Sequence, residues 1–402
     1  MPDAKVLSPG EQVAQRTITT YTLTPAQMVK SEGLYRTGIV LSFAYPALEL
    51  AIVAAILWTR FGSRLQRLAE RASRNRFVQA CIFVPLLLLL FNLLELPLEI
   101  YSHHLSRAYG LSVQGWGSWL WDQAKSMAIS IPMMTLCLWG IYAAIRKTRR
   151  WWLWGWFVGV PLMAFIVFLS PVLLDPVFNR FDSLKATNPE LTTQLQSLAR
   201  SSGLNIPESR IYLMHASDKV TTYNAYVTGF GATKRIVVWD TTARDMTVPQ
   251  TLFIFGHEMG HYVMHHIYIG MALSAVGMFV GLWLVSVLVP WMIQRQGARW
   301  GVASLGDWAS LPLLIGVVTV LSFVSAPLDS TISRQLEHAA DAYGLQVTLP
   351  VTPNARQVAA QSFQLLGEKS YSYPEPARLY VVWHYSHPPI AERIHFVLGE
   401  EK

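Results

Sequence analysis

The chain has 402 residues, of which 52% are hydrophobic and only 14% are charged, and its mean hydropathy is +0.30. Because soluble domains contain about 25% charged residues, this composition excludes a disordered chain, a coiled coil and an ordinary two-domain soluble enzyme. The net charge of +7 does not indicate nucleic acid as a partner, since much of the basic excess lies in short clusters beside apolar runs. The sequence therefore predicts a mostly α-helical protein that spans a lipid bilayer several times.

The first 37 residues are polar and lack the features of a cleaved signal peptide. Six apolar stretches follow that reach the roughly 20 residues required for a membrane span. The predicted spans are 38–58, 78–98, 119–145, 152–174, 267–289 and 311–330. The predicted plan is a polar segment (1–37), four spans (38–174), a soluble insert (175–266), two spans (267–330) and a soluble tail (331–402).

The short loops differ in charge between the two sides of the predicted membrane domain. The loops after the first, third and fifth spans contain Arg60, Arg64, Arg67, Arg71, Arg74, Arg76, Arg146, Lys147, Arg149, Arg150, Arg295 and Arg299. The other side has only Lys30, Arg36 and Arg107. Since basic loops favour the cytoplasm, the charge bias predicts that the soluble insert and tail lie on the non-cytoplasmic side.

A metal-binding motif, HEMGH, occupies residues 257–261 near the end of the insert. Residues four positions apart share a helix face, so His257 and His261 can bind one Zn²⁺ at about 2.0–2.1 Å. Glu258 is then placed to activate the zinc-bound water as a general base. Pro249 is typical of the first turn of a helix. About 0.01 copies of this pattern are expected by chance at this His and Glu content, so the motif indicates a zinc metallopeptidase.

The residues after the motif limit the possible classes of HExxH zinc peptidase. Metzincins require Gly and His at the positions of Met264 and Ile267, so that class is excluded. His265 continues the four-residue spacing, but eight residues of helix turn its side chain away from the face of His257. We therefore interpret His265 as a polar residue near the membrane boundary rather than as a third ligand.

A third ligand is expected downstream, in the segment SRQLEHAADAYG (333–344). Glu337 and Asp341 are four residues apart and share one helical face. One carboxylate can bind zinc while the other accepts the N–H of a ligating histidine and fixes its tautomer. The spacing alone does not assign the two roles.

Residues 224–240, NAYVTGFGATKRIVVWD, predict two strands joined by a turn at Gly229 and Gly231. A strand beside a zinc helix can pair with the backbone of an extended peptide. An ordinary hairpin without a role in binding is the alternative.

Four segments together resemble the type I CAAX prenyl protease family, integral-membrane zinc metallopeptidases of the gluzincin type. They are SDKVTTYNAYVTGFGATKRIVVWDT (217–241), GHEMGHYVMHH (256–266), SRQLEHAADAYG (333–344) and WHYSHPPIAERI (383–394). The resemblance implies about six transmembrane helices that carry a zincin-type α+β metallopeptidase domain. It also implies one zinc ion per chain, held by His257, His261 and Glu337, with Glu258 as the general base. Asp341 is left as the partner of a ligating histidine.

The resemblance further implies a peptide or protein substrate. Asn224 resembles the residue at the edge strand that bonds the substrate backbone. His387 and Arg393 resemble the pair that contacts the substrate carbonyl and stabilises the developing oxyanion. The expected reaction is hydrolysis of peptide bonds in membrane-associated or prenylated (CAAX-type) polypeptides.

Two further expectations concern the setting of the protein. Family members with seven spans begin with an additional N-terminal helix, and its absence here favours a bacterial protein of the inner membrane. The alternative function is a non-proteolytic membrane transporter or scaffold with a structural zinc site. The sequence does not indicate an oligomeric state.

Overall fold

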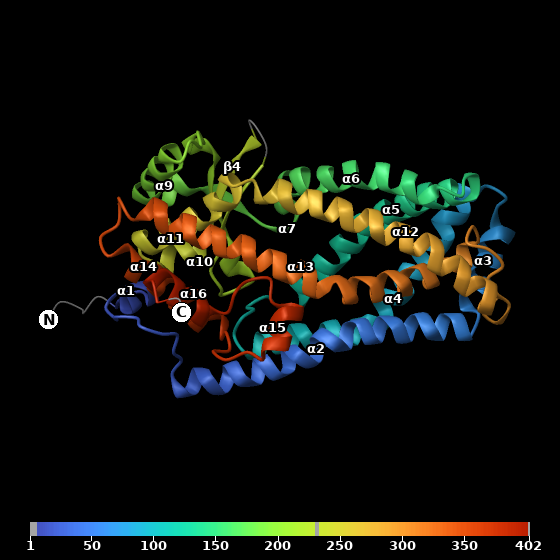
Figure 1. Ribbon diagram of the computed structural model, residues 1–402, viewed down its shortest axis with the longest axis horizontal. Coiled ribbons are helices and arrows are strands. Elements are labelled where there is room, and N and C mark those ends of the chain that lie inside the picture. The colour runs from blue at the N-terminus through green and yellow to red at the C-terminus, as the bar shows by residue number, and fades with distance from the viewer. Residues whose placement is uncertain (1–5, 230–232, 401–402) are drawn as a thin grey trace.

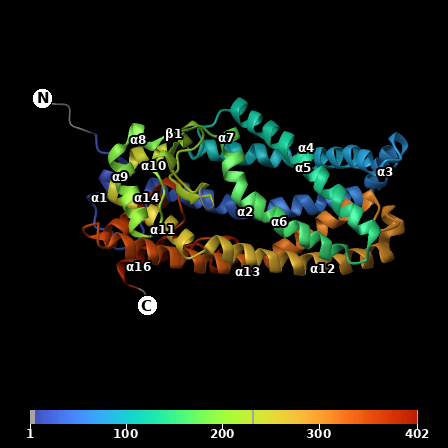
Figure 2. The same cartoon turned by 90° about the horizontal axis from the view of Figure 1, so that it is seen from above.

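The computed structural model describes residues 6–229 and 233–400. Within these residues, six helices are long and apolar enough to cross a membrane, which confirms the predicted multispanning helical fold. They are α2 (Pro25–Trp58), α4 (Arg76–Ala108), α5 (Trp116–Lys147), α6 (Trp151–Leu173), α12 (His266–Trp300) and α13 (Leu311–Thr348). Together they form an elongated bundle (Figures 1 and 2).

Most of the remaining elements gather at one end of the bundle, where they form an α+β domain (Figures 1 and 2). Its helices are α1 (Pro9–Ala14), α7 (Asp175–Phe178), α8 (Leu184–Thr187), α9 (Pro189–Ser201), α10 (Asp240–Asp245), α11 (Val248–Val263), α14 (Ala355–Ser370), α15 (Arg378–His384) and α16 (Ile390–Leu398). Its strands are β1 (Phe181–Ser183), β2 (Ile211–Met214), β3 (Ala225–Thr228) and β4 (Arg235–Trp239). The short helix α3 (Phe61–Ala72) lies at the opposite end of the bundle.

The long helices extend beyond the predicted apolar spans. Helix α2 begins at Pro25, within the segment expected to be polar, because Thr24 and Gln27 form a capping box and Pro25 suits the first turn. Helix α13 has 38 residues. At a rise of about 1.5 Å per residue it is nearly twice as long as the roughly 30 Å hydrocarbon core. It therefore spans the membrane and continues into the α+β domain.

The sheet has the strand order β1-β2-β4-β3, so β3 is an edge strand. Strands β3 and β4 are antiparallel, with Ala225 opposite Val238, which confirms the two predicted strands. The chain leaves β3 at Gly229, whose φ of +94° is in the left-handed region that favours glycine. Gly231, the second predicted break, lies outside the described residues. Helix α11 packs beside the edge strand.

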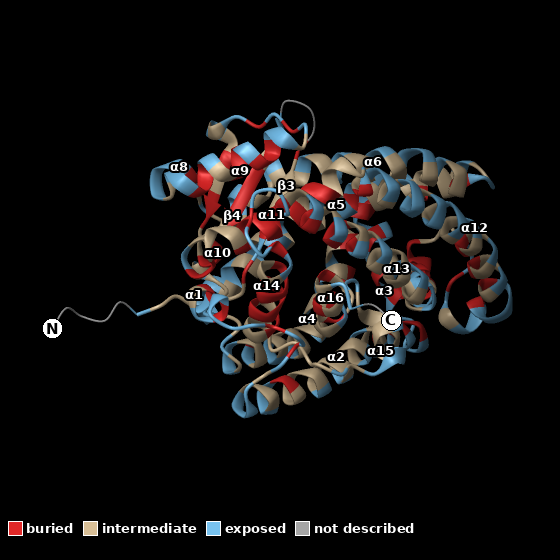
Figure 3. Ribbon diagram, turned by 60° about the vertical axis from the view of Figure 1, so that its left-hand side comes forward, coloured by how far each residue is buried: buried red, intermediate tan, exposed pale blue. Residues whose placement is uncertain are grey.

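Buried side chains form two large cores. One lies in the α+β domain, where Phe253, Phe255 and Phe363 are fully buried between α11, α14 and their neighbours (Figure 3). The other lies near α3, where the Trp308 ring stacks on Tyr142. In contrast, at most 33% of the residues in any of the six apolar segments are buried. Apolar helices with exposed outer faces are those that contact lipid.

Helix α14 binds the backbone of the N-terminal segment through three glutamines. The Gln357 side chain accepts a hydrogen bond from the Ile18 N–H (3.0 Å) and donates one to the Ile18 carbonyl (2.9 Å). Gln364 makes the same pair of bonds with Thr22, and Gln361 donates to two further carbonyl groups. Residues at these spacings share one helix face. The N-terminal segment is thereby part of the α+β domain.

Candidate metal centre

The HEMGH motif lies on helix α11, as predicted. Thr247 caps the helix, and its side chain and that of Gln250 form a capping box. Pro249 lies in the first turn, where a missing N–H costs nothing. Of the eleven residues from Gln250 to Gly260, all except Glu258 are buried, so the helix crosses the interior of the domain.

Small residues let α11 and α13 approach each other closely. A Cβ atom added to Gly260 would lie 3.2 Å from the Ala340 Cα atom. One added to Gly344 would lie 2.8 Å from the backbone nitrogen of His257, which is closer than real Cβ contacts allow. The two glycines therefore permit a spacing that places the histidines of α11 against Glu337 of α13.

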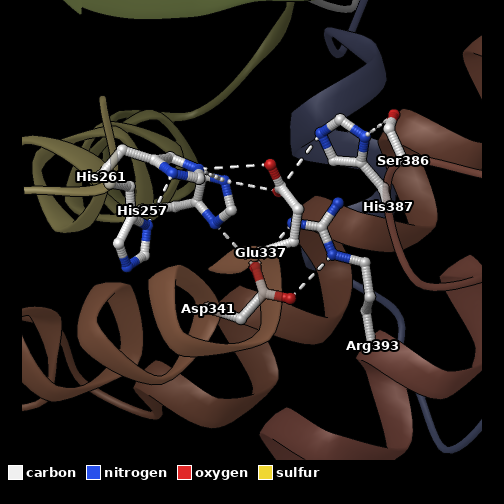
Figure 4. A network of polar contacts seen from close by, with 8 residues as sticks. His257, His261, Glu337, Asp341, Ser386, His387 and Arg393 are labelled. Carbon is white, nitrogen blue, oxygen red and sulfur yellow. Dashed lines mark hydrogen bonds and ion pairs between the residues drawn. The ribbon is translucent and has the colours of Figure 1, made fainter. Parts of the chain in front are cut away.

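Three donor atoms from these helices converge on one point (Figure 4). The Nε2 atom of His257 lies 3.2 Å from Glu337 Oε2, and the Nε2 atom of His261 lies 3.4 Å from Glu337 Oε1. The two Nε2 atoms are 3.2 Å apart. Ligands at about 2.0–2.1 Å from a tetrahedral zinc ion are separated by about 3.3 Å. The spacing of the three side chains thus matches a zinc site.

The chemistry of the donor set also fits a cation. Two imidazoles and one carboxylate are a common ligand set of catalytic zinc sites. The Glu337 carboxylate is largely buried, and its Oε2 atom lies 3.2 Å from a ring nitrogen of both His257 and His387. A buried carboxylate needs a cationic or hydrogen-bonding partner, and a bound cation would balance its charge.

Asp341 lies one helical turn after Glu337 and contacts the other ring nitrogen of His257. Its Oδ1 atom is 2.7 Å from His257 Nδ1, the ring nitrogen that faces away from Glu337 (Figure 4). The Arg393 guanidinium donates to both Asp341 oxygens, at 2.8 and 2.6 Å. The Asp341 side chain is 1% exposed. The buried carboxylate thus holds the Nδ1–H tautomer of His257, which leaves Nε2 free to bind a metal.

These contacts set the charge of His257 and Arg393. Burial disfavours a charged imidazole, but the hydrogen bonds from His257 to Asp341 and Glu337 outweigh burial and raise its pKa to about 9. Burial also opposes the charge on Arg393, yet the neighbouring Asp341 raises the pKa of the guanidinium. The buried Asp341 carboxylate thus interacts favourably with both side chains, His257 and Arg393.

Glu258 lies in a cavity of about 130 Å³ beside the three donor atoms. His257, His387 and Arg393 line the same cavity, together with apolar side chains that include Met246. Burial raises the pKa of the Glu258 carboxyl, and the nearby histidines oppose this effect. A carboxyl group with a raised pKa in such a cavity is suited to accept and release a proton.

His387 reaches the centre from the loop before α16. Its Nε2 atom is 3.2 Å from Glu337 Oε2, and its Nδ1 atom is 2.9 Å from the Ser386 hydroxyl (Figure 4). The side chain is 54% exposed. Burial lowers the pKa of His387, although Glu337 acts in the opposite direction. The half-exposed His387 ring therefore stands at the open side of the centre.

Asn224 lies directly before the edge strand β3 and lines the same cavity as Glu258. Its backbone is fixed by Thr242, whose hydroxyl accepts from the Asn224 N–H and donates to the Asn224 carbonyl, both at 2.9 Å. All eight side chains selected from the sequence are therefore at or beside one centre. Their individual roles stay predictions.

Two histidines follow the motif, and they have different environments. His265 is exposed at the break between α11 and α12, in agreement with the interpretation that it is not a ligand. His266 is 7% exposed, and its Nδ1 atom is 3.0 Å from Nδ1 of His261. On a continuous helix, His266 would lie on another face than His261, so its position in the sequence does not indicate this contact.

Comparison with known families gives two matches that together cover most of the chain. Residues 185–401 match the model of peptidase family M48. Residues 16–180 match a model described as CAAX prenyl protease N-terminal, five membrane helices. The first match includes the whole candidate metal centre.

Individual relatives agree with these matches. The uncharacterized metalloprotease YhfN of Bacillus subtilis is 35% identical over 94% of this chain and 87% of its own length. CAAX prenyl protease 1 of Saccharomyces cerevisiae is 28% identical over 79% of this chain and 71% of its own length. The crystal structure of S. mikatae Ste24p has the same fold, with a TM-score of 0.80 at 22% identity over 97% of this chain and 94% of that chain. The chain therefore belongs to peptidase family M48 and is a membrane-embedded zinc metalloprotease.

Proposed function

We propose that the protein is an endopeptidase with one zinc ion per chain, held by His257, His261 and Glu337. Its proposed substrates are membrane-associated polypeptides, including prenylated ones of the CAAX type. The observation that carries this proposal is the convergence of three donor atoms within 4.8 Å of one another, beside the cavity that holds Glu258.

In the proposed reaction, the metal polarises the substrate and Glu258 transfers the proton. When bound, zinc supplies a Lewis acid that polarises a peptide carbonyl and makes a water molecule more acidic. The Glu258 carboxylate takes a proton from the attacking water and passes it to the nitrogen of the departing amine. The raised pKa of Glu258 supports the first transfer, because the conjugate base of a weaker acid takes a proton from water more readily.

His387 and Arg393 are proposed to stabilise the negative charge that develops on the carbonyl oxygen. His387 stands at the open side of the centre, with an Nε2 atom that can donate to a substrate oxygen. Arg393 is bonded to Asp341 and is 8% exposed, so we propose that its charge acts from within the wall of the cavity. A fixed cation in a buried site needs no reorganisation during the reaction.

The substrate is proposed to bind as an extended strand beside β3. An edge strand offers unpaired backbone groups to a peptide, and Asn224 lies where this edge meets the cavity. The apolar side chains of Met246, Ile254 and Leu366 line the cavity and would receive an apolar substrate side chain.

Prenylated substrates are proposed from two observations. Several relatives, from yeast to human, are named CAAX prenyl protease 1 or its homologue. The metal centre lies next to the ends of long apolar helices, so a lipid-anchored substrate would have its peptide close to the site.

The α+β domain is proposed to lie on the non-cytoplasmic side of a bacterial inner membrane. The basic residues of α3 and of the adjoining loops lie at the end of the bundle opposite this domain (Figures 1 and 2). Among them Arg64, Arg67 and Arg71 are exposed. Basic loops are retained in the cytoplasm, which leaves the metal centre on the other side.

The proposed substrate class can be tested with purified full-length protein in detergent. Metal analysis should give one zinc per chain. A farnesylated CAAX peptide and the same peptide without the lipid are then compared by mass spectrometry. Faster cleavage of the farnesylated peptide is expected, whereas equal rates would contradict recognition of the lipid but not the peptidase function.

A further inference from the structure

The zinc ligand His261 has a polar partner of its own, as His257 has Asp341. His261 directs Nε2 toward His257 and Glu337, which leaves Nδ1 as the nitrogen that carries the proton when Nε2 binds a metal. The Nδ1 atom of His266 lies 3.0 Å from this nitrogen. The two rings are nearly perpendicular, with centroids 5.0 Å apart.

His266 owes its position to the interruption between helices α11 and α12. On an uninterrupted helix, a residue five positions after His261 lies about 140° away around the axis. Helix α11 instead ends at Val263, and His265 adopts φ +59° and ψ +29° before α12 begins at His266. This turn brings His266 back toward the side of α11 on which His261 lies.

The backbone of His265 indicates that the break is specifically maintained. A residue other than glycine in the left-handed region costs about 1–2 kcal/mol, and such residues persist where the surrounding structure requires them. The His265 side chain is exposed, so its own contacts with the interior do not explain this conformation. The next residue, His266, is buried and lies against His261.

We propose that His266 is a positioning residue of the metal centre, which accepts the Nδ1–H of His261 and so fixes the tautomer and the orientation of that ligand. The inference rests on the proposed zinc site. The acceptor must be the unprotonated Nδ1 atom of His266, which places its own ring hydrogen on Nε2. His261 would then have a neutral partner, whereas His257 has a buried carboxylate.

The test uses three variants of the full-length protein. His266→Leu keeps an apolar side chain of similar size but removes the acceptor. His266→Asn restores an oxygen close to the position of Nδ1. His265→Asn removes the neighbouring imidazole, and asparagine tolerates the left-handed conformation of this position. The dissociation constant for Zn²⁺ is measured for each by competition with a chelator, and the absorption of the Co²⁺-loaded protein reports the geometry of the ligands.

We expect His266→Leu to weaken zinc binding roughly 10–100-fold, as loss of such partners does, and to change the Co²⁺ spectrum. His266→Asn should recover most of the affinity, and His265→Asn should bind like the unmodified chain. The proposal is overturned if His266→Leu binds zinc normally, or if His266→Asn is as weak as His266→Leu, since a purely structural role would give no rescue. Failure of the unmodified chain to bind zinc would overturn the proposed function as well.

Discussion

Gly344 of α13 packs directly against the backbone of His257 of α11, so closely that an added Cβ atom would lie 2.8 Å from the His257 nitrogen. Both carboxylates of the centre, Glu337 and Asp341, are on the same helix as this glycine. The distance between the two helices therefore sets the distance between the histidines and the carboxylates.

Replacing Gly344 with alanine should damage the centre by forcing the helices apart. Overpacking of this kind typically costs 1–3 kcal/mol, about the range expected for Gly344→Ala in the free energy of unfolding. Zinc affinity should fall as well, because Glu337 moves away from His257 and His261. Gly281→Ala is the control, since nothing lies within 4 Å of its added Cβ atom. Equal stability and zinc affinity in the two variants would contradict the close contact.

Removal of the Asp341 carboxylate should have two measurable effects. Asp341→Ala leaves the buried Arg393 charge unpaired, and breaking a buried ion pair costs about 3–5 kcal/mol of unfolding free energy. It also removes the partner of His257, so zinc affinity should fall about 10–100-fold. Asp329→Ala, which changes an exposed residue of the same helix, should alter neither quantity. Chemical denaturation and chelator competition measure the two effects separately.

The glutamine contacts of α14 should stabilise the N-terminal segment. In the variant Gln357→Leu, the buried Ile18 loses the partners of both its backbone groups. The expected loss is about 1–3 kcal/mol in the free energy of unfolding, with faster proteolysis before residue 25. Gln346→Ala, at an exposed position of α13, should change stability by less than about 0.5 kcal/mol. Unchanged proteolysis of Gln357→Leu would show that the contacts do not hold the segment.

The membrane orientation can be mapped with single cysteines. Cys81 and Cys137 are first replaced by alanine. Two separate variants then each contain a single exposed cysteine: Arg71→Cys in α3 and Arg200→Cys in the α+β domain at the opposite end. In spheroplasts, a membrane-impermeant thiol reagent should label the Arg200→Cys protein at once. The Arg71→Cys protein should be labelled only after permeabilisation. The reverse pattern would place the metal centre in the cytoplasm.

The sequence was sufficient to predict those features that depend on residues close together in the chain. The HEMGH motif, its helix cap and the strands on either side of Gly229 are local patterns, and the apolar runs predicted the six long helices. The division of the chain into five parts stays a prediction. The capped start of α2 at Pro25 was missed, because the first turns of this helix are polar and do not resemble a membrane span.

Other features depend on contacts between distant segments. The spacing of Glu337 and Asp341 left their roles open, and only the packing of α13 against α11 gives them different positions. The bond between Arg393 and Asp341 joins residues 52 positions apart. The contact of His266 depends on the left-handed turn at His265, which no glycine marks in the sequence.

The most direct test of the account is the variant Glu258→Gln, studied as purified full-length protein. Metal analysis and cleavage of a CAAX peptide are measured on the same preparation as the unmodified chain. We predict that the variant retains one zinc per chain, since Glu258 is not among the three ligands, and that cleavage is lost because no carboxylate is present to transfer the proton. Undiminished cleavage by a zinc-loaded Glu258→Gln protein would contradict the proposed mechanism.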